Sequence, residues 1–311
     1  MMGKADNKRA WPVLEWHQWR DTAETLHMMT QIVGKTRLAL TPLRNHWWNV
    51  PLYVTARGLS TSVMPLPDGE LFEIEFDFQD HLLHFRHSAK RQAALPLHAQ
   101  SVAEFYAQYR RALISLGVPS VIKTLPVECP DPIHFDVDTT HRSYDPDAVH
   151  RFWRVLGLAE TVFKSFSGNF YGKISPVHFF WGSFDLAVTR FNGLRAPPRP
   201  GADPIQAEAY SHVCISAGFW PGNGGYGRAA FYCYAAPVPP GLGDKPLSSL
   251  GGFDARMGEF LLDYSDVQRA PDPAATVITF LKATYSACAD AAGWDRAVLD
   301  RIDVGAAEPA S

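Results

Sequence analysis

Apolar residues recur at helical spacing in several stretches of the chain. Residues 13–34 carry them on one face of a helix, and Gly34 is expected to end this helix because glycine is common just past a helix C-terminus. Ser101 is a good N-cap for a second amphipathic helix, which runs to Gly117. The same periodicity predicts three further helices, over residues 147–172, 273–292 and 294–302.

Strict alternation marks the clearest strand. In residues 70–79 the side chains of Phe72, Ile74 and Phe76 fall on one face and acidic residues fall on the other, which is the pattern of a half-buried strand. A second apolar run follows directly, so residues 70–87 are predicted to form a β-hairpin. Shorter strand-like runs occupy residues 36–40, 51–62, 176–180, 184–191, 210–219, 228–235 and 258–264.

The two halves of the chain resemble each other in three places and in the same order. The helical stretch Ala23–Lys35 matches Ala159–Lys173, each half then has a histidine and an aromatic cluster before a strand, and the helix Ser101–Val118 matches Thr276–Trp294. This order predicts an α+β fold of two diverged α-β-β-β-β-α repeats, related by a pseudo-twofold axis, with mainly antiparallel sheets flanked by helices. The expected boundaries are a first repeat over residues 1–118, a Pro/Asp-rich linker over 119–146, a second repeat over 147–304 and a disordered tail over 305–311.

The composition is that of a globular protein without charge bias. Of the 311 residues 46% are hydrophobic, and the formal net charge is −3, so no basic excess points to nucleic acid or to an anionic membrane. No stretch approaches the ~20 apolar residues that span a bilayer. The four cysteines are scattered and form no CxxC pair, which predicts reduced thiols in the cytoplasm.

Two histidines lie at matching places in the two repeats, each within an aromatic cluster. His46 stands beside Trp47 and Trp48, and His178 precedes an aromatic run that ends in Trp181. Because crevices between two lobes are common ligand sites, both histidines are expected to face a cleft between the repeats, with the tryptophans lining it.

Histidines with a neighbouring carboxylate suggest acid/base chemistry in that cleft. A neutral imidazole beside a carboxylate can act as a general base near neutral pH, so His46 or His178 is the predicted catalytic group and Asp185 its orienting partner. His212, on a later strand, is a further predicted binding residue. Two alternatives stay open: a metal site built from His46, His178 and His212, and buried histidines that bond only to backbone.

Arginines at the ends of apolar strands suggest an anionic ligand. Arg57 and Arg190 fall at matching places in the repeats, and a guanidinium suits carboxylate or phosphate, so the two are predicted to clamp an anion. The alternative role is an internal salt bridge to Glu24, Glu160 or Asp185. Arg37 and Lys173 are basic residues of the same kind, and Trp220 is predicted to line the same pocket.

Familiar catalytic motifs are missing or out of context. Gly222-x-Gly224-x-x-Gly227 matches the dinucleotide fingerprint, but an aromatic strand-like run follows it instead of a helix, so a hairpin loop is expected. The chain has no GxSxG, P-loop or HExxH motif. The acids of residues 136–145 lack EF-hand spacing and are expected to cap local turns and the helix that follows. No cofactor and no metal is therefore predicted.

Several tryptophan- and histidine-bearing stretches make the sequence recognisable. They read WPVLEW, GKTRLAL, NHWWNVPLYVTARGLSTS, SPVHFFWGSFDLAVTRFNG and SAGFWPG. Through them the chain resembles, over nearly its whole length, a bacterial family known as a domain of unknown function, DUF5996. The resemblance implies family membership and no particular activity.

Two functions fit these residues. The first is an enzyme that acts on a small, anionic molecule in the cleft between the repeats by histidine acid/base chemistry. The second is a non-catalytic small-molecule-binding protein that uses the same aromatic-lined pocket. In both cases the expected partner is a small-molecule ligand, and the sequence sets neither the reaction nor the oligomeric state.

Overall fold

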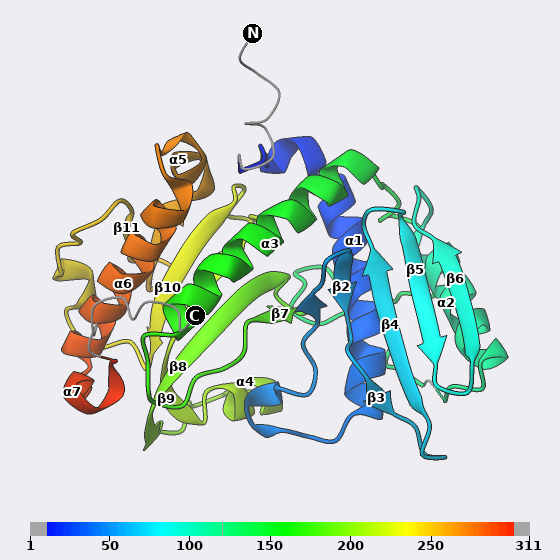
Figure 1. Ribbon diagram of the computed structural model, residues 1–311, viewed down its shortest axis with the longest axis horizontal. Coiled ribbons are helices and arrows are strands. Elements are labelled where there is room, and N and C mark those ends of the chain that lie inside the picture. The colour runs from blue at the N-terminus through cyan, green and yellow to red at the C-terminus, as the bar shows by residue number, and fades with distance from the viewer. Residues whose placement is uncertain (1–10, 120, 302–311) are drawn as a thin grey trace, which may run out of the picture. The chain divides into compact units, whose positions relative to one another are not determined.

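Helices and two antiparallel sheets of six strands each make up the described part of the chain (Figure 1). The structure is a computed structural model that describes residues 11–119 and 121–301, and the tail predicted for residues 305–311 lies outside this range. The α+β class with mainly antiparallel sheets is confirmed. None of the described helices combines the length and the hydropathy that a membrane span requires.

The first sheet is built around the alternating strand of the sequence. Its strands are β1 (Tyr53–Val54), β2 (Gly58–Ser60), β3 (Met64–Pro65), β4 (Leu71–Asp77), β5 (Leu82–His87) and β6 (Arg91–Pro96), in the order β1-β2-β4-β5-β6 with β3 paired to β4. Phe72, Ile74 and Phe76 are buried on one face, and β4 pairs antiparallel with β5 so that Ile74 lies opposite Phe85. The hairpin predicted for residues 70–87 is confirmed.

Two helices cover one face of this sheet (Figure 1). They are α1 (Trp16–Leu40) and α2 (Val102–Ser115). Ser101 caps α2 as predicted: its hydroxyl accepts the Glu104 N–H, and the Glu104 carboxylate accepts the Ser101 N–H, which makes a capping box. The buried Tyr109 hydroxyl of α2 donates to Thr36 of α1 at 2.7 Å and so ties the two helices together.

The course of α1 corrects one prediction. The helix continues through Gly34 to Leu40, so the expected stop at Gly34 and the expected strand at residues 36–40 are both wrong. A Cβ atom at Gly34 would lie 2.3 Å from the indole ring of Trp181. Because only glycine lets a ring come so close to the helix backbone, the residue that resembles a helix end is the place where Trp181 docks.

The second sheet follows the order β11-β12-β10-β9-β8-β7. Its strands are β7 (His178–Phe180), β8 (Asp185–Arg195), β9 (His212–Trp220), β10 (Ala230–Ala236), β11 (Gly252–Asp254) and β12 (Glu259–Asp263). The glycine motif lies between β9 and β10, so the predicted hairpin loop is confirmed. The other helices are α3 (Pro146–Ser167), α4 (Pro204–Ala209), α5 (Tyr264–Arg269), α6 (Pro273–Ala291) and α7 (Arg296–Leu299), with short 3-10 turns η2 (Asn45–Trp47) and η3 (Leu242–Asp244).

Residues 121–145 contain no helix or strand, as their prolines predict. Their acids bond to nearby backbone. The Asp138 carboxylate accepts two backbone N–H groups of the turn that follows it, and the Asp145 carboxylate accepts the N–H groups of Asp147 and Ala148 at the start of α3. The capping role expected for these acids is confirmed for Asp138 and Asp145.

The described residues divide into two compact units that do not follow chain order. The first unit takes the described residues up to Ala159 together with His178–Leu186 and Phe219–Ala230. The second takes Glu160–Val177, Ala187–Gly218 and the described residues from Phe231 on. Each sheet follows a long helix and precedes a shorter one, but the internal duplication and its boundaries stay predictions.

Candidate functional site

Basic and aromatic side chains gather around His178 in the first unit. Backbone hydrogen bonds join Leu52 and Phe179 at 2.9 Å in both directions and so place β1 beside β7. The neighbouring side chains Tyr53 and His178 therefore meet, with ring centres 5.7 Å apart. Arg37, near the end of α1, lies with its guanidinium carbon 5.5 Å from the centre of the Tyr53 ring. The Arg37–His178 cluster comprises Arg37, Arg44, His46, Trp48, Tyr53, His178 and Phe180.

The imidazole of His178 has no hydrogen-bond partner. The residue is fully buried, and neither Nδ1 nor Nε2 is bonded to any described residue. Three rings lie edge-on to it, with centres 5.9 Å away for Trp48, 5.7 Å for Tyr53 and 5.4 Å for Phe180. Buried polar atoms are nearly always bonded, so a buried ring with two unpartnered nitrogens is exceptional and makes His178 a candidate for contact with a ligand.

The second unpartnered group is the guanidinium of Arg37. The residue is 7% exposed, and its Nε and Nη1 atoms are buried without hydrogen-bond partners. Burial lowers the pKa of Arg37, the Tyr53 phenol opposes this, and Arg44 adds to it. Burial, followed by the charges of Arg37 and Arg44, lowers the pKa of His178 to about 3. No carboxylate of the described residues contributes to either shift, so the positive charge of the cluster is uncompensated.

The segment between α1 and β1 brings aromatic rings to the cluster under backbone strain. His46 and Trp47 have φ angles of 56° and 59°, in the left-handed region that residues other than glycine rarely adopt. Such a conformation costs about 1–3 kcal/mol per residue and is concentrated at ligand sites. The His46 ring centre lies 5.6 Å from that of Trp48, and the Thr41 hydroxyl donates to the Asn49 carbonyl at 3.0 Å, which closes the segment into a loop.

Asp185 and Trp181 each make a hydrogen bond to a residue outside the cluster. Asp185 accepts the Ser183 hydroxyl at 2.5 Å, and because neither nitrogen of His178 has a partner, Asp185 does not orient that ring. Trp181 donates its indole N–H to the Val50 carbonyl at 2.9 Å. The predicted pairing of an imidazole with the Asp185 carboxylate is therefore absent at His178.

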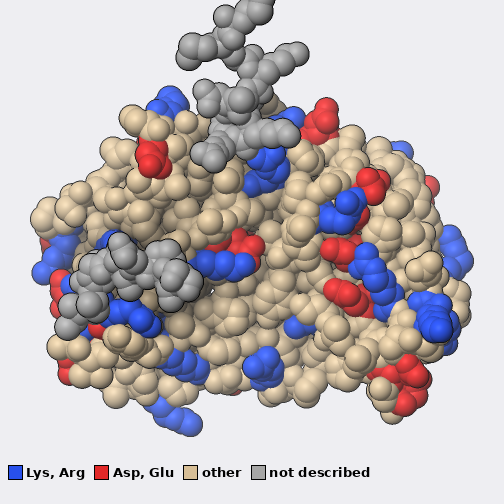
Figure 2. Space-filling view, viewed as in Figure 1, with Lys and Arg blue, Asp and Glu red and all other residues tan. Residues whose placement is uncertain are grey.

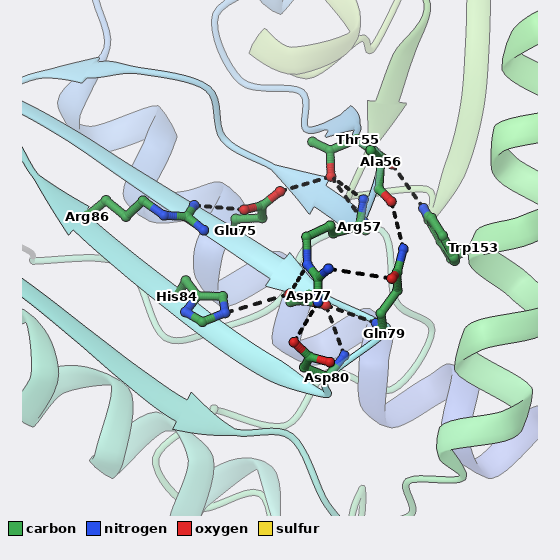
Figure 3. Close-up of polar contacts among 11 residues, drawn as sticks. Thr55, Ala56, Arg57, Glu75, Asp77, Gln79, Asp80, His84, Arg86 and Trp153 are labelled. Atoms are coloured by element: carbon green, nitrogen blue, oxygen red, sulfur yellow. Dashed lines mark hydrogen bonds and ion pairs between the residues drawn. The ribbon is translucent and has the colours of Figure 1, made fainter.

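Arg57 is paired with carboxylates on the open face of the first sheet (Figure 3). Its Nε bonds the carboxylate of Asp77, and its Nη2 bonds that of Asp80 at 2.6 Å. Burial alone would raise the pKa of Asp77, but the bond from Arg57 and two backbone N–H groups outweigh it and hold this pKa below its usual value. Figure 2 shows basic and acidic side chains side by side on this face. Arg57 thus makes internal ion pairs, but with Asp77 and Asp80 and not with Glu24, Glu160 or Asp185, the partners that we considered from the sequence.

Arg190 belongs to the second unit, where aromatic rings enclose it. Its guanidinium carbon lies 3.6 Å from the ring centre of Phe166, 4.9 Å from that of Phe170 and 4.3 Å from that of Tyr285. Its Nη2 donates to the Phe166 carbonyl oxygen. Cation–π contacts of this kind stabilise a buried arginine without a ligand. His212 also lies in this unit, at the start of β9.

Trp220 is the last residue of β9, in the first unit and outside the cluster. It donates to the Asn223 side-chain oxygen at 2.5 Å and stacks on Tyr226 with ring centres 5.1 Å apart. The structure brings together four of the site residues expected from sequence. His46, Trp47 and Trp48 lie in the segment between α1 and β1, and His178 lies in β7.

The sequence did not point to Arg44 or Tyr53, and it placed Arg37 on a strand. Arg37 and Tyr53 both lie in stretches that carry the family resemblance, GKTRLAL and NHWWNVPLYVTARGLSTS. Their position in these stretches is the sequence signal that could have identified Arg37 and Tyr53.

Polar side chains earlier in α1 have a structural role. His27, Gln31 and Lys35 share one helix face, as their spacing predicts. Gln31 donates to the Val127 carbonyl and accepts the Val127 N–H, each at 2.8 Å, and His27 donates to the Gly182 carbonyl at 2.8 Å. Burial lowers the pKa of His27 to about 4. These bonds dock two loops on α1.

Within residues 11–119 and 121–301, no group of three or more His, Cys, Asp and Glu side chains is placed to hold a metal ion. The metal site considered for His46, His178 and His212 is therefore not formed in this part of the chain.

The fold and the cluster together define an α+β protein with a buried, uncompensated basic site. The sequence profile of a family of unknown function, DUF5996, matches residues 11–301, and the chain belongs to this family. Comparisons with curated proteins and with solved structures found no match. Family membership assigns no chemistry to the cluster.

Proposed function

We propose that the protein binds a small anionic molecule at the Arg37–His178 cluster and does so without catalysing a reaction. The main support is Arg37, which is 7% exposed, has two buried nitrogens without hydrogen-bond partners and has no carboxylate acting on its charge. An isolated buried charge is costly, so buried charges in proteins are paired. An anionic ligand supplies the partner that the described residues do not.

The chemistry of the surrounding groups suits a carboxylate or phosphate. Arg37 offers hydrogen-bond donors and positive charge in a water-poor place, where ionic contacts are strongest. Arg44 adds a second positive charge that acts on the same imidazole. The rings of Trp48, Tyr53 and Phe180 surround the imidazole with apolar surface, which favours a small molecule over an extended polymer.

Binding fits the cluster better than the acid/base catalysis that we considered for His46 or His178. A general base works best with a pKa near the working pH and with a group that orients it. The pKa of His178 is about 3, and neither of its nitrogens is bonded to a carboxylate. These properties indicate a neutral imidazole that is not placed to act as a general base.

We also propose that the protein works in the bacterial cytoplasm. All four cysteines are free thiols, and three of them are buried. Unpaired thiols are the rule in reducing compartments, whereas secreted proteins tend to pair theirs. Fractionation of the source cells tests this part: recovery in an extracellular or periplasmic fraction would contradict it.

Isothermal titration calorimetry of the full chain with sulfate, phosphate and acetate tests the binding proposal. The buffer is organic, free of chloride and of constant ionic strength, because other anions would compete. We expect saturable binding of at least one anion at one site per chain. Arg37→Met should weaken it about 10- to 100-fold, since a hydrogen bond to a charged group contributes about 1.5–3 kcal/mol.

The control is Arg86→Met, because Arg86 is 46% exposed and pairs with Glu75 at 2.7 Å on the open face of the first sheet. This variant should bind like the wild type. Absence of saturable binding for all three anions, or equal affinities for Arg37→Met and the wild type, would overturn the proposed function.

A further inference from the structure

His178 brings two nitrogens into the cluster that no described residue bonds. A neutral imidazole has one N–H donor and one lone pair, whereas an imidazolium has two N–H donors. An anion repels the lone pair, so a neutral ring can offer it only one of its two nitrogens. The protonation state of His178 therefore decides how much the ring contributes to anion binding.

The groups that face this ring keep it neutral in the unliganded protein. The charges of Arg37, on α1, and of Arg44, in the segment after α1, act on the ring, and the Tyr53 ring of β1 lies edge-on to it. The His46 ring contacts the Trp48 indole, and this indole in turn contacts the His178 ring. Two of these groups are cations and none is a carboxylate, so burial and charge both oppose a proton on His178.

We infer that the cluster takes up its oxyanion together with one proton, which His178 holds. This inference rests on the proposed anion binding. An oxyanion at Arg37 offsets the positive charges that oppose protonation and adds a negative charge near the ring. The proton comes from solvent, and the resulting imidazolium carries an N–H on each nitrogen, so the ring no longer has a lone pair that repels the anion.

Sulfate is the probe for the test, because it stays a dianion between pH 5.5 and 7.5 and cannot itself carry the proton. Titrations of the full chain in two buffers of different ionisation enthalpy give the number of protons taken up per sulfate. We expect a value close to one, and an association constant that rises up to about tenfold for each unit by which the pH falls.

Two matched variants assign the proton. His178→Asn should bind sulfate more weakly, without proton uptake and without dependence on pH. His98→Asn removes an exposed histidine from the loop before α2 and should behave like the wild type. The wild-type measurement shows by itself whether a proton is taken up, and His178→Gln provides a second variant if His178→Asn does not fold.

The outcomes separate the two claims. Saturable sulfate binding without proton uptake would overturn this inference and leave anion binding standing. Proton uptake that persists in both His178 variants would overturn its assignment to His178. No saturable binding of sulfate, phosphate or acetate at any pH in this range would overturn the inference together with the proposed function.

Discussion

Replacing Arg37 by methionine should make the unliganded protein more stable. The substitution keeps an unbranched apolar side chain in the space that the arginine stem fills, and it removes a guanidinium whose Nε and Nη1 are sealed from water without partners. Loss of a buried charge usually destabilises a protein because its partner is left behind, but Arg37 has no carboxylate partner to leave.

The magnitude follows from the contacts that are removed. Each buried polar atom without a partner costs about 1–3 kcal/mol, so removal of two recovers about 2–6 kcal/mol. The contact with the Tyr53 ring, at 5.5 Å, is lost and is worth about 0.5–1 kcal/mol. The balance is a gain of about 1–5 kcal/mol in the free energy of unfolding.

Urea denaturation followed by tryptophan fluorescence measures this gain. The buffer has to be free of chloride, sulfate and phosphate, because a bound anion would stabilise the wild type by mass action. Arg190→Met is the matched control, since Arg190 is 2% exposed but lies 3.6 Å from the Phe166 ring and bonds the Phe166 carbonyl. Its Nε also lacks a partner, which offsets part of these contacts, so the variant should lose about 1–3 kcal/mol and the two buried arginines should respond with opposite sign.

A loss of more than about 1 kcal/mol in Arg37→Met under these conditions would refute the reasoning, because it would make Arg37 a structural residue like Arg190. A further check is the addition of sulfate, which should stabilise the wild type and leave Arg37→Met unchanged. Equal stabilisation of both proteins would contradict the placement of the anion at Arg37.

Three other substitutions test the fold around the site. Gly34→Ala should lower the free energy of unfolding by about 1–3 kcal/mol or more in urea, because its methyl group would overlap the Trp181 ring, 2.3 Å away. Arg57→Gln should lower the free energy of unfolding at pH 7, since it removes the arginine that pairs with the buried Asp77 carboxylate. Because the pKa of Asp77 is lowered in the folded protein, its stabilisation is present above about pH 4 and is lost as the pH falls through the folded pKa; acid titration of the variant should show a smaller loss. Ser101→Ala should cost about 1 kcal/mol in urea by removing the cap of α2, and an unchanged midpoint would contradict that role.

Local structure and fold class followed from the sequence by itself. The alternation in residues 70–87 was enough for a hairpin, Ser101 for a helix start, and the prolines of residues 121–145 for a segment without helix or strand. These features depend on interactions within a few residues, namely side-chain direction, backbone capping and proline geometry. The groups that decide these features are neighbours in the sequence, so the sequence alone is enough to predict them.

Only the tertiary structure decided which residues form the candidate site. Gly34 has the sequence context of a helix end, yet a tryptophan far along the chain makes it a docking point. Arg57 and Arg190 look alike in sequence, but one bonds carboxylates and the other lies among aromatic rings. Arg37 differs from both because it has no carboxylate partner and because its Nε and Nη1 have no hydrogen-bond partner. An unpaired charge is a property of every group packed nearby, and that packing is set by contacts between distant segments, which no local pattern of residues contains.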